Sequence, residues 1–147
     1  MSALPASCVV DASVGIRLFL SEEHSQTVQE LFEQRLLLPR ESLFVPDLFF
    51  IECANILWKK VRRGEYGADD ALSHLADLRA LALSATPSSE LMERALEIAC
   101  AHDVTAYDAS YIALAEMRAV PFVTTDDRLA DKLEGTPHEI ITLCQLA

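Results

Sequence analysis

The feature that most constrains the fold of this 147-residue chain is the alternation of short apolar runs with longer amphipathic stretches. The runs expected to form strands are SCVVD, SLFVP, LSATP, PFVTTDD and EIITLCQL. Helices are expected at residues 12–20, 24–38, 48–63, 68–83, 88–102, 105–119 and 128–135. Strands separated by helices favour parallel pairing, because a parallel neighbour needs a crossover that is usually helical. The sequence therefore predicts an α/β fold, a three-layer α/β/α sandwich with a mostly parallel central sheet, as a single domain over residues 1–147.

Charge and composition narrow the classes of function. The chain carries 23 acidic against 12 basic residues, a formal charge of −11, so its surface as a whole should repel nucleic acid. Contact with a nucleic acid must then be local or assisted by a metal ion. No signal peptide pattern and no uncharged run of about 20 residues is present, so we expect a cytoplasmic protein with no membrane segment.

The cysteines and histidines do not form a recognisable motif. Cys8, Cys53, Cys100 and Cys144 are far apart, lack a C-x-x-C pair and have apolar neighbours, which is typical of reduced core residues in a cytosolic protein. The four histidines fall in different predicted elements and are interpreted as surface or structural residues.

Acidic residues at four places in the chain stand out, one of them a pair of adjacent aspartates. Asp11 directly follows the first predicted strand, and Asp126 and Asp127 follow a later one, at the ends where parallel sheets bind their ligands. Glu52 lies in a helix among apolar residues, and Asp108 begins a helix of small residues. A helix cap is an alternative explanation for Asp11 and for Asp126, and Thr105 with Asp108 fits a capping box.

As a group, these carboxylates indicate a metal site. Acids gathered in an apolar setting repel one another and lose hydration, and a divalent cation between them offsets both effects. Oxygen ligands alone favour Mg²⁺ or Mn²⁺ over zinc or copper. Such an ion suits hydrolysis of a phosphodiester, so a nuclease is the leading enzyme class.

The order VVDASV, ECANIL, AYDASYIALA and FVTTDDRL resembles a PIN-domain ribonuclease, and the small single-domain form resembles the VapC toxins of toxin–antitoxin pairs. The resemblance covers nearly the whole chain. It implies a catalytic set of Asp11, Glu52, Asp108 and Asp126, with Mg²⁺ or Mn²⁺ held by Asp11 and Asp108, and by Glu52 directly or through water. Ser13 and Thr124 match hydroxyl residues that flank the acids, and Asn55 is a weaker supporting candidate. Asp126 is preferred to Asp127 because T-x-D then leaves Arg128 and Leu129 in the usual register.

By the same resemblance, the protein is expected to be a Mg²⁺-dependent endoribonuclease that acts on RNA, forms a homodimer and is silenced by a cognate antitoxin. An RNA-processing PIN nuclease without an antitoxin and a non-catalytic PIN scaffold module are the alternatives. A haloacid-dehalogenase-type phosphatase is disfavoured, since its second acid would stand where this chain has Ser13. The cluster KKVRR, Lys59 to Arg63, is interpreted as a solvated helix end or as a site for an RNA backbone. Phe49, Phe50 and Trp58 could meet a partner or belong to the core.

Overall fold

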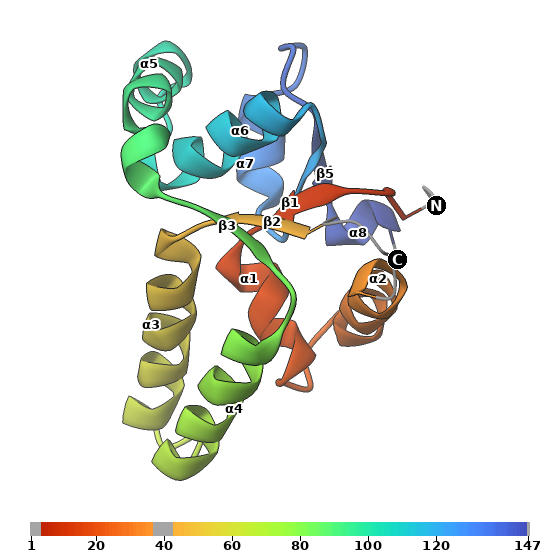
Figure 1. Cartoon of the computed structure of the whole chain (residues 1–147), viewed down its shortest axis with the longest axis vertical. Helices are drawn as coiled ribbons and strands as arrows, with labels where there is room; N and C mark the ends of the chain where they lie inside the picture. Colours follow the sequence, from red (N-terminus) through yellow and green to blue (C-terminus); the bar gives the residue numbers. More distant parts are fainter. Residues whose placement is uncertain (1–3, 37–42, 147) are drawn as a thin grey trace.

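A parallel sheet in the order β3-β2-β1-β4-β5 forms the centre of the computed structural model, which describes residues 4–36 and 43–146 (Figure 1). Every strand pair in it is parallel. The strands are β1 (Cys8–Val10), β2 (Leu43–Pro46), β3 (Ser84–Thr86), β4 (Phe122–Thr124) and β5 (Ile140–Thr142). Each forms within one of the five apolar runs, so the predicted α/β fold is confirmed.

Helices cover both faces of the sheet. In Figure 1, α5 and α6 lie above the sheet, and α1, α3 and α4 lie below it, which gives the three predicted layers. The helices are α1 (Ala12–Gly15), α2 (Ser25–Leu36), α3 (Leu48–Arg62), α4 (Ala68–Ala80), α5 (Met92–His102), α6 (Ala106–Arg118), α7 (Asp127–Lys132) and α8 (Leu143–Leu146), with short 3-10 turns η1 (Ile16–Leu18) and η2 (Ser88–Glu90). In the described part of the chain, no helix is long and apolar enough to cross a membrane.

The end of the chain differs from the predicted closing strand. Within the run EIITLCQL, only Ile140–Thr142 pair with β4, and the following four residues form α8. Leu143 and Leu146 are both buried, and a spacing of three residues places them on one side of a helix. The Thr142 N–H donates to Gln145 Oε1 at 2.9 Å, so a side chain provides its acceptor. The apolar composition alone did not separate these two outcomes.

Other helix boundaries also shift. The helix predicted over 68–83 ends at Ala80, the one over 88–102 begins as η2, and the one over 128–135 is found at Asp127–Lys132. The helix predicted over 12–20 becomes α1 and the 3-10 turn η1, while the helix predicted over 24–38 is described only to Leu36. Residues 37 and 38 of that prediction lie outside the described residues.

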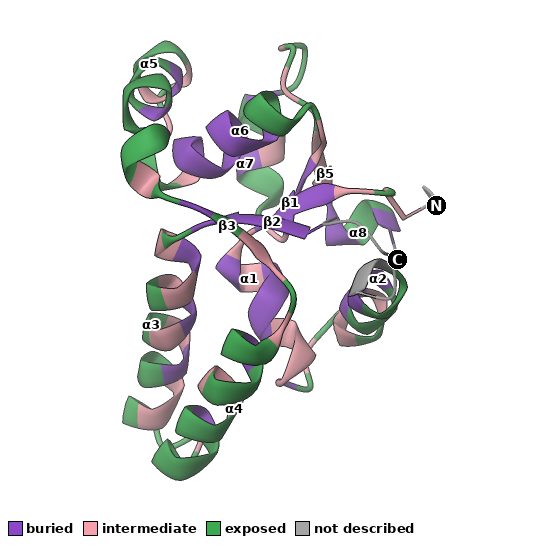
Figure 2. Cartoon of the chain, viewed as in Figure 1, coloured by how far each residue is buried: buried purple, intermediate pink, exposed green. Residues whose placement is uncertain are grey.

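The central strands form the core, which Figure 2 shows as a buried band between the helical layers. All three residues of β1 are buried, as are the residues of β4. Cys8 and Cys53 belong to this core, as predicted, but Cys100 and Cys144 are exposed, so the prediction was wrong for them. Cys100 lies two residues after the buried Ile98, which turns it about 200° around α5 and away from the core.

The strand order reverses between β1 and β4. The chain passes from β1 outward to β2 and β3, and later from β4 outward to β5 on the other side. Ligands of open parallel sheets bind at such a reversal, beyond the carboxyl ends of the strands. Asp11 follows β1 at this point, and Thr125 and Asp126 follow β4.

Candidate active site

A cavity of about 670 Å³ opens where the strand order reverses. Its walls come from the start of α1, the exposed side of α3, the first turns of α6 and the turn after β4. The lining residues are Asp11, Ala12, Ser13, Ile51, Glu52, Asn55, Ile56, Lys59, Asp108, Tyr111, Thr125 and Asp126. We call this cavity the acidic pocket. Six of the seven sequence-predicted site residues line it, and the seventh, Thr124, contacts Asp11 from the end of β4.

Asp11 both caps a helix and lines the pocket. Its Oδ1 accepts from the Val14 N–H at 3.1 Å, which caps α1, and from the Ser13 hydroxyl at 2.5 Å. Its Oδ2 accepts from the Thr124 hydroxyl at 2.5 Å. Burial raises the pKa of Asp11, these three hydrogen bonds oppose the rise, and the charge of Asp108 adds to it. The predicted helix cap is therefore present, and the same carboxylate lines the pocket.

Hydroxyl groups join the end of β4 to α1. The Thr125 hydroxyl donates to Ser13 Oγ at 2.8 Å, and Ser13 donates in turn to Asp11. Thr124 also accepts from the Asp126 N–H at 3.2 Å. Thr125 was not predicted to belong to the site, although the doubled threonine of FVTTDD was a visible signal.

The turn after β4 distinguishes the two adjacent acids. Asp126 lines the acidic pocket and caps α7 by accepting from the Leu129 N–H at 3.1 Å. Asp127 lies in the first turn of α7 and is not among the described residues that line the pocket, although both acids are exposed. The geometry agrees with the preference for Asp126.

Glu52 is held by Tyr111, a residue that was not predicted to belong to the site. The Tyr111 hydroxyl donates to Glu52 Oε1 at 2.6 Å, across 59 residues of sequence. Tyr111 is buried and stacks on Phe122, with ring centroids 5.4 Å apart. Burial raises the pKa of Glu52, the Tyr111 hydrogen bond opposes the rise, and the charges of Asp11 and Asp108 add to it.

Asp108 enters the pocket from the first turn of α6. The Thr105 hydroxyl accepts from the Asp108 N–H at 3.1 Å, so the predicted N-cap is present. Burial raises the pKa of Asp108, repulsion from Asp126 raises it further, and Thr105 lowers it. Three acids thus have raised pKa values in one pocket, which indicates a place where negative charge is not compensated by the protein.

The donor set fits a largely hydrated cation. Among residues 4–36 and 43–146, no three His, Cys, Asp or Glu side chains form a preassembled metal cage. Mg²⁺ does not require one, because it usually keeps several waters and binds one or two carboxylates. Asp11 accepts three hydrogen bonds, and a carboxylate offers about four acceptor positions, so about one remains for a ligand.

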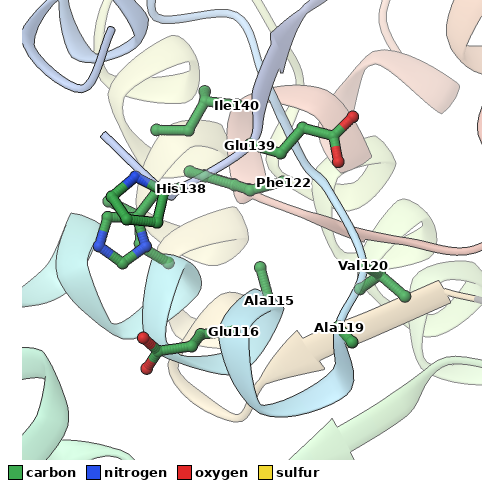
Figure 3. A pocket seen from close by; sticks show the side chains of 10 residues that line it. Ala115, Glu116, Ala119, Val120, Phe122, His138, Glu139 and Ile140 are labelled. Atoms are coloured by element: carbon green, nitrogen blue, oxygen red, sulfur yellow. The ribbon is translucent and has the colours of Figure 1, made fainter. Parts of the chain in front are cut away.

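A second cavity, of about 260 Å³, lies between α6 and β5 (Figure 3). Phe122 and Ile140, which line it, begin β4 and β5, so it lies at the amino-terminal edge of the sheet. Its carboxylate Glu116 already forms ion-paired hydrogen bonds of 2.7 and 2.8 Å with Arg94. The ring of His138, which lines this cavity, packs edge-on against the ring of His102, with the centroids 5.6 Å apart. The histidines take no part in the acidic pocket.

The aromatic residues of α3 divide between core and surface. Phe49 is buried, Phe50 is half-buried and Trp58 is 52% exposed. Lys59, the first residue of KKVRR, lines the acidic pocket, so this cluster begins at the site.

The comparisons with known proteins agree with this geometry. The sequence matches the PIN domain family over residues 8–134. It is 37% identical to "Ribonuclease VapC3" of Pyrobaculum aerophilum over 126 residues, 84% of this chain and 92% of that protein. A crystal structure of PAE2754 from Pyrobaculum aerophilum superposes with a TM-score of 0.66 at 27% identity and covers 98% of this chain and 91% of that one.

A chain from a toxin–antitoxin complex of Klebsiella pneumoniae has a TM-score of 0.62 at 14% identity, covers 93% of this chain and 98% of that one, and shows the shared fold. The family match spans most of the sequence and the relative is similar along nearly its whole length. The chain therefore belongs to the PIN-domain family and, within it, to the VapC proteins.

Proposed function

We propose that the protein is a Mg²⁺- or Mn²⁺-dependent endoribonuclease that acts as the toxin of a toxin–antitoxin pair. The observation that carries the proposal is the convergence of Asp11, Glu52, Asp108 and Asp126, from four separate segments, on one pocket at the strand reversal. The relative named a ribonuclease supports RNA as the substrate.

Each residue of the pocket has a role in this proposal. Asp11 and Asp108 would hold the ion, with Glu52 as a direct or water-mediated ligand and Asp126 completing the negative surface. When bound, the ion would supply Lewis-acid activation of water and stabilisation of charge on the phosphate. Ser13 and Thr124 fix the orientation of the Asp11 carboxylate, and Tyr111 fixes that of Glu52. Asn55, on the pocket wall, can hydrogen-bond the substrate.

The proposed partners follow from the family. A cognate antitoxin would silence the enzyme in the cytoplasm, and the active form would be a homodimer. Membership of the VapC proteins and the neighbour taken from a toxin–antitoxin complex support the antitoxin. Induced expression should arrest growth, and co-expression of the adjacent open reading frame should restore it. Normal growth in both cases would instead favour an RNA-processing enzyme or a scaffold.

Cleavage of a circular RNA tests the enzymatic part directly, because only an endonuclease can open a circle. We expect linear products with Mg²⁺ or Mn²⁺, none in chelator, and recovery when the metal is restored. Asp126→Asn should reduce the rate by about 100-fold or more, while Asp127→Asn, the matched neighbour, should retain it. Cleavage that persists in chelator would overturn the metal-dependent mechanism.

A further inference from the structure

We propose that the exposed face of α3 guides a single-stranded segment of the RNA away from the acidic pocket and stacks one of its bases on Trp58. This inference rests on the proposed function and adds the route of the substrate. The face consists of Ile51, Asn55, Trp58, Lys59 and Arg62, and we call it the α3 stripe.

Helix geometry makes the stripe continuous. At 100° per residue its five members fall within an arc of about 100°, and the buried residues Phe49, Cys53 and Leu57 lie on the opposite side. Ile51, Asn55 and Lys59 also line the acidic pocket. Arg62 lies about 10 Å further along the axis than Asn55. The stripe therefore leads from the pocket towards the end of α3.

The stripe ends in positive charge that the protein leaves available. Four of the twelve lysines and arginines of the chain lie within Lys59–Arg63. Lys60 is paired with Glu22 at 2.7 Å. Lys59, Arg62 and Arg63 have no carboxylate partner among the described residues. In a chain of net charge −11, this is a local site where phosphates can be bound.

Trp58 adds a surface for a base. Its side chain is 52% exposed, and the guanidinium carbon of Arg62 lies 5.0 Å from its ring centroid. Single-stranded RNA is recognised by stacking on aromatic rings and guanidinium planes, combined with cationic contacts to phosphates. Neutralising the helix dipole would explain cations at the end of α3, but it requires no exposed indole beside them.

The charge of the stripe favours RNA over a protein partner. A protein interface of this kind would be centred on apolar residues and depleted of lysine, whereas the stripe has Arg62 between Trp58 and Asn55 in the arc and Lys59 at its edge. It also borders the pocket in which the phosphodiester would be cleaved.

The experiment uses the fluorescence of Trp58, which is the only tryptophan in the chain. The Asp108→Asn variant, in which we expect cleavage to be abolished, is titrated with a short unstructured RNA and with an abasic oligonucleotide of equal length. We expect the RNA to quench the fluorescence in a saturable way and the abasic strand to bind without quenching. Trp58→Ala in the same background should weaken RNA binding by about 5- to 150-fold, and Trp58→Phe should retain most of it.

Arg118 provides a matched control for Arg62. It is an exposed arginine at the end of α6 whose guanidinium carbon lies 5.2 Å from the ring centroid of Phe44, far along the sequence from the stripe. Arg62→Ala should weaken RNA binding and reduce quenching, and Arg118→Ala should change neither.

The outcomes separate this inference from the proposed function. RNA binding without quenching, or equal binding by Trp58→Ala, would overturn the route along α3 while wild-type cleavage still supports the nuclease. Quenching that depends on protein concentration without RNA would assign Trp58 to an interface between copies and also overturn the route. Quenching by RNA in a protein whose wild type cleaves no RNA would overturn the nuclease and leave the RNA surface in place.

Discussion

At the scale of single residues, two carboxylates of the site have two tasks each: they cap a helix and they line the acidic pocket. Asp11 caps α1 with the same carboxylate that lines the acidic pocket, and Asp126 does the same for α7. An N-cap needs a side-chain oxygen just before its helix. Here that position follows the end of a strand, which is also where a parallel sheet binds ligands. The capping role and the proposed catalytic role therefore fall on the same two carboxylates.

Tyr111 is predicted to position Glu52. Its pKa is raised by burial and by Glu52, so the phenol stays a hydrogen-bond donor. Tyr111→Phe keeps the ring stacked on Phe122 but removes the donor, and we expect cleavage to fall by about 10- to 100-fold. Cleavage rates of the purified variants measure the effect, and thermal melts show whether the change also alters the stability of the fold.

Tyr107→Phe is the matched control for this change, because Tyr107 lies in the same helix and is 69% exposed. Equal cleavage by the Tyr111 and Tyr107 variants would show that the Tyr111 hydroxyl has no role in the reaction.

At the scale of elements, the contact between α1 and α3 sets the distance between Asp11 and Glu52. Gly15 makes this contact possible, since a Cβ at this position would lie 2.6 Å from Cζ of Phe49. Phe49 is fully buried, so its ring has no room to move away. The Phe49 ring of α3, the helix of Glu52, therefore packs directly on the backbone of α1, the helix that Asp11 caps.

Gly15→Ala is expected to destabilise the protein by about 1–3 kcal/mol and to reduce cleavage, because α1 must shift from α3. Urea denaturation measures the stability. Phe49→Leu combined with Gly15→Ala should cost less than the sum of the single changes, since the smaller side chain makes room for the methyl group. Strictly additive costs would mean that the two residues do not limit the packing.

The elements also show which parts of the structure were accessible from sequence. Each strand could be predicted from a short apolar run, and the capping residues Asp11 and Thr105 from their place before a helix. The helix α8 could not, because Leu143 and Leu146 suit a strand or a helix until burial is known. Tyr111 and Thr125 were missed because their hydrogen bonds join residues 59 and 112 positions apart, and only tertiary packing creates such pairs.

At the scale of the whole molecule, the acidic pocket makes stability depend on pH. The pKa values of Asp11, Glu52 and Asp108 are raised above the ordinary 3.8 of Asp and 4.5 of Glu, so the folded protein binds protons more tightly than the unfolded chain. In chelator, stability should therefore increase as pH falls from about 7 through these raised values.

Thermal melts above pH 4.5 measure this effect in a His138→Gln background, because the pKa of His138 is lowered by burial and this group contributes with the opposite sign. Below pH 4.5, Glu116, whose pKa is lowered by Arg94, also contributes with the opposite sign. The increase should be smaller in Asp11→Asn, which lacks one of the three carboxylates, and smaller in saturating Mg²⁺. A melting temperature that falls steadily as the pH is lowered from about 7 to 4.5 in chelator would contradict uncompensated charge in the pocket.

The central claim is that the acidic pocket binds the catalytic cation. Titration of the protein with Mn²⁺, monitored by the electron paramagnetic resonance signal of the free ion, tests it without requiring an RNA substrate. We predict a saturable site in the wild type that is weakened by at least about 10-fold in Asp11→Asn and Asp108→Asn and retained in Asp127→Asn. Mn²⁺ binding that is equally tight in the wild type and in the Asp11 and Asp108 variants would contradict the account.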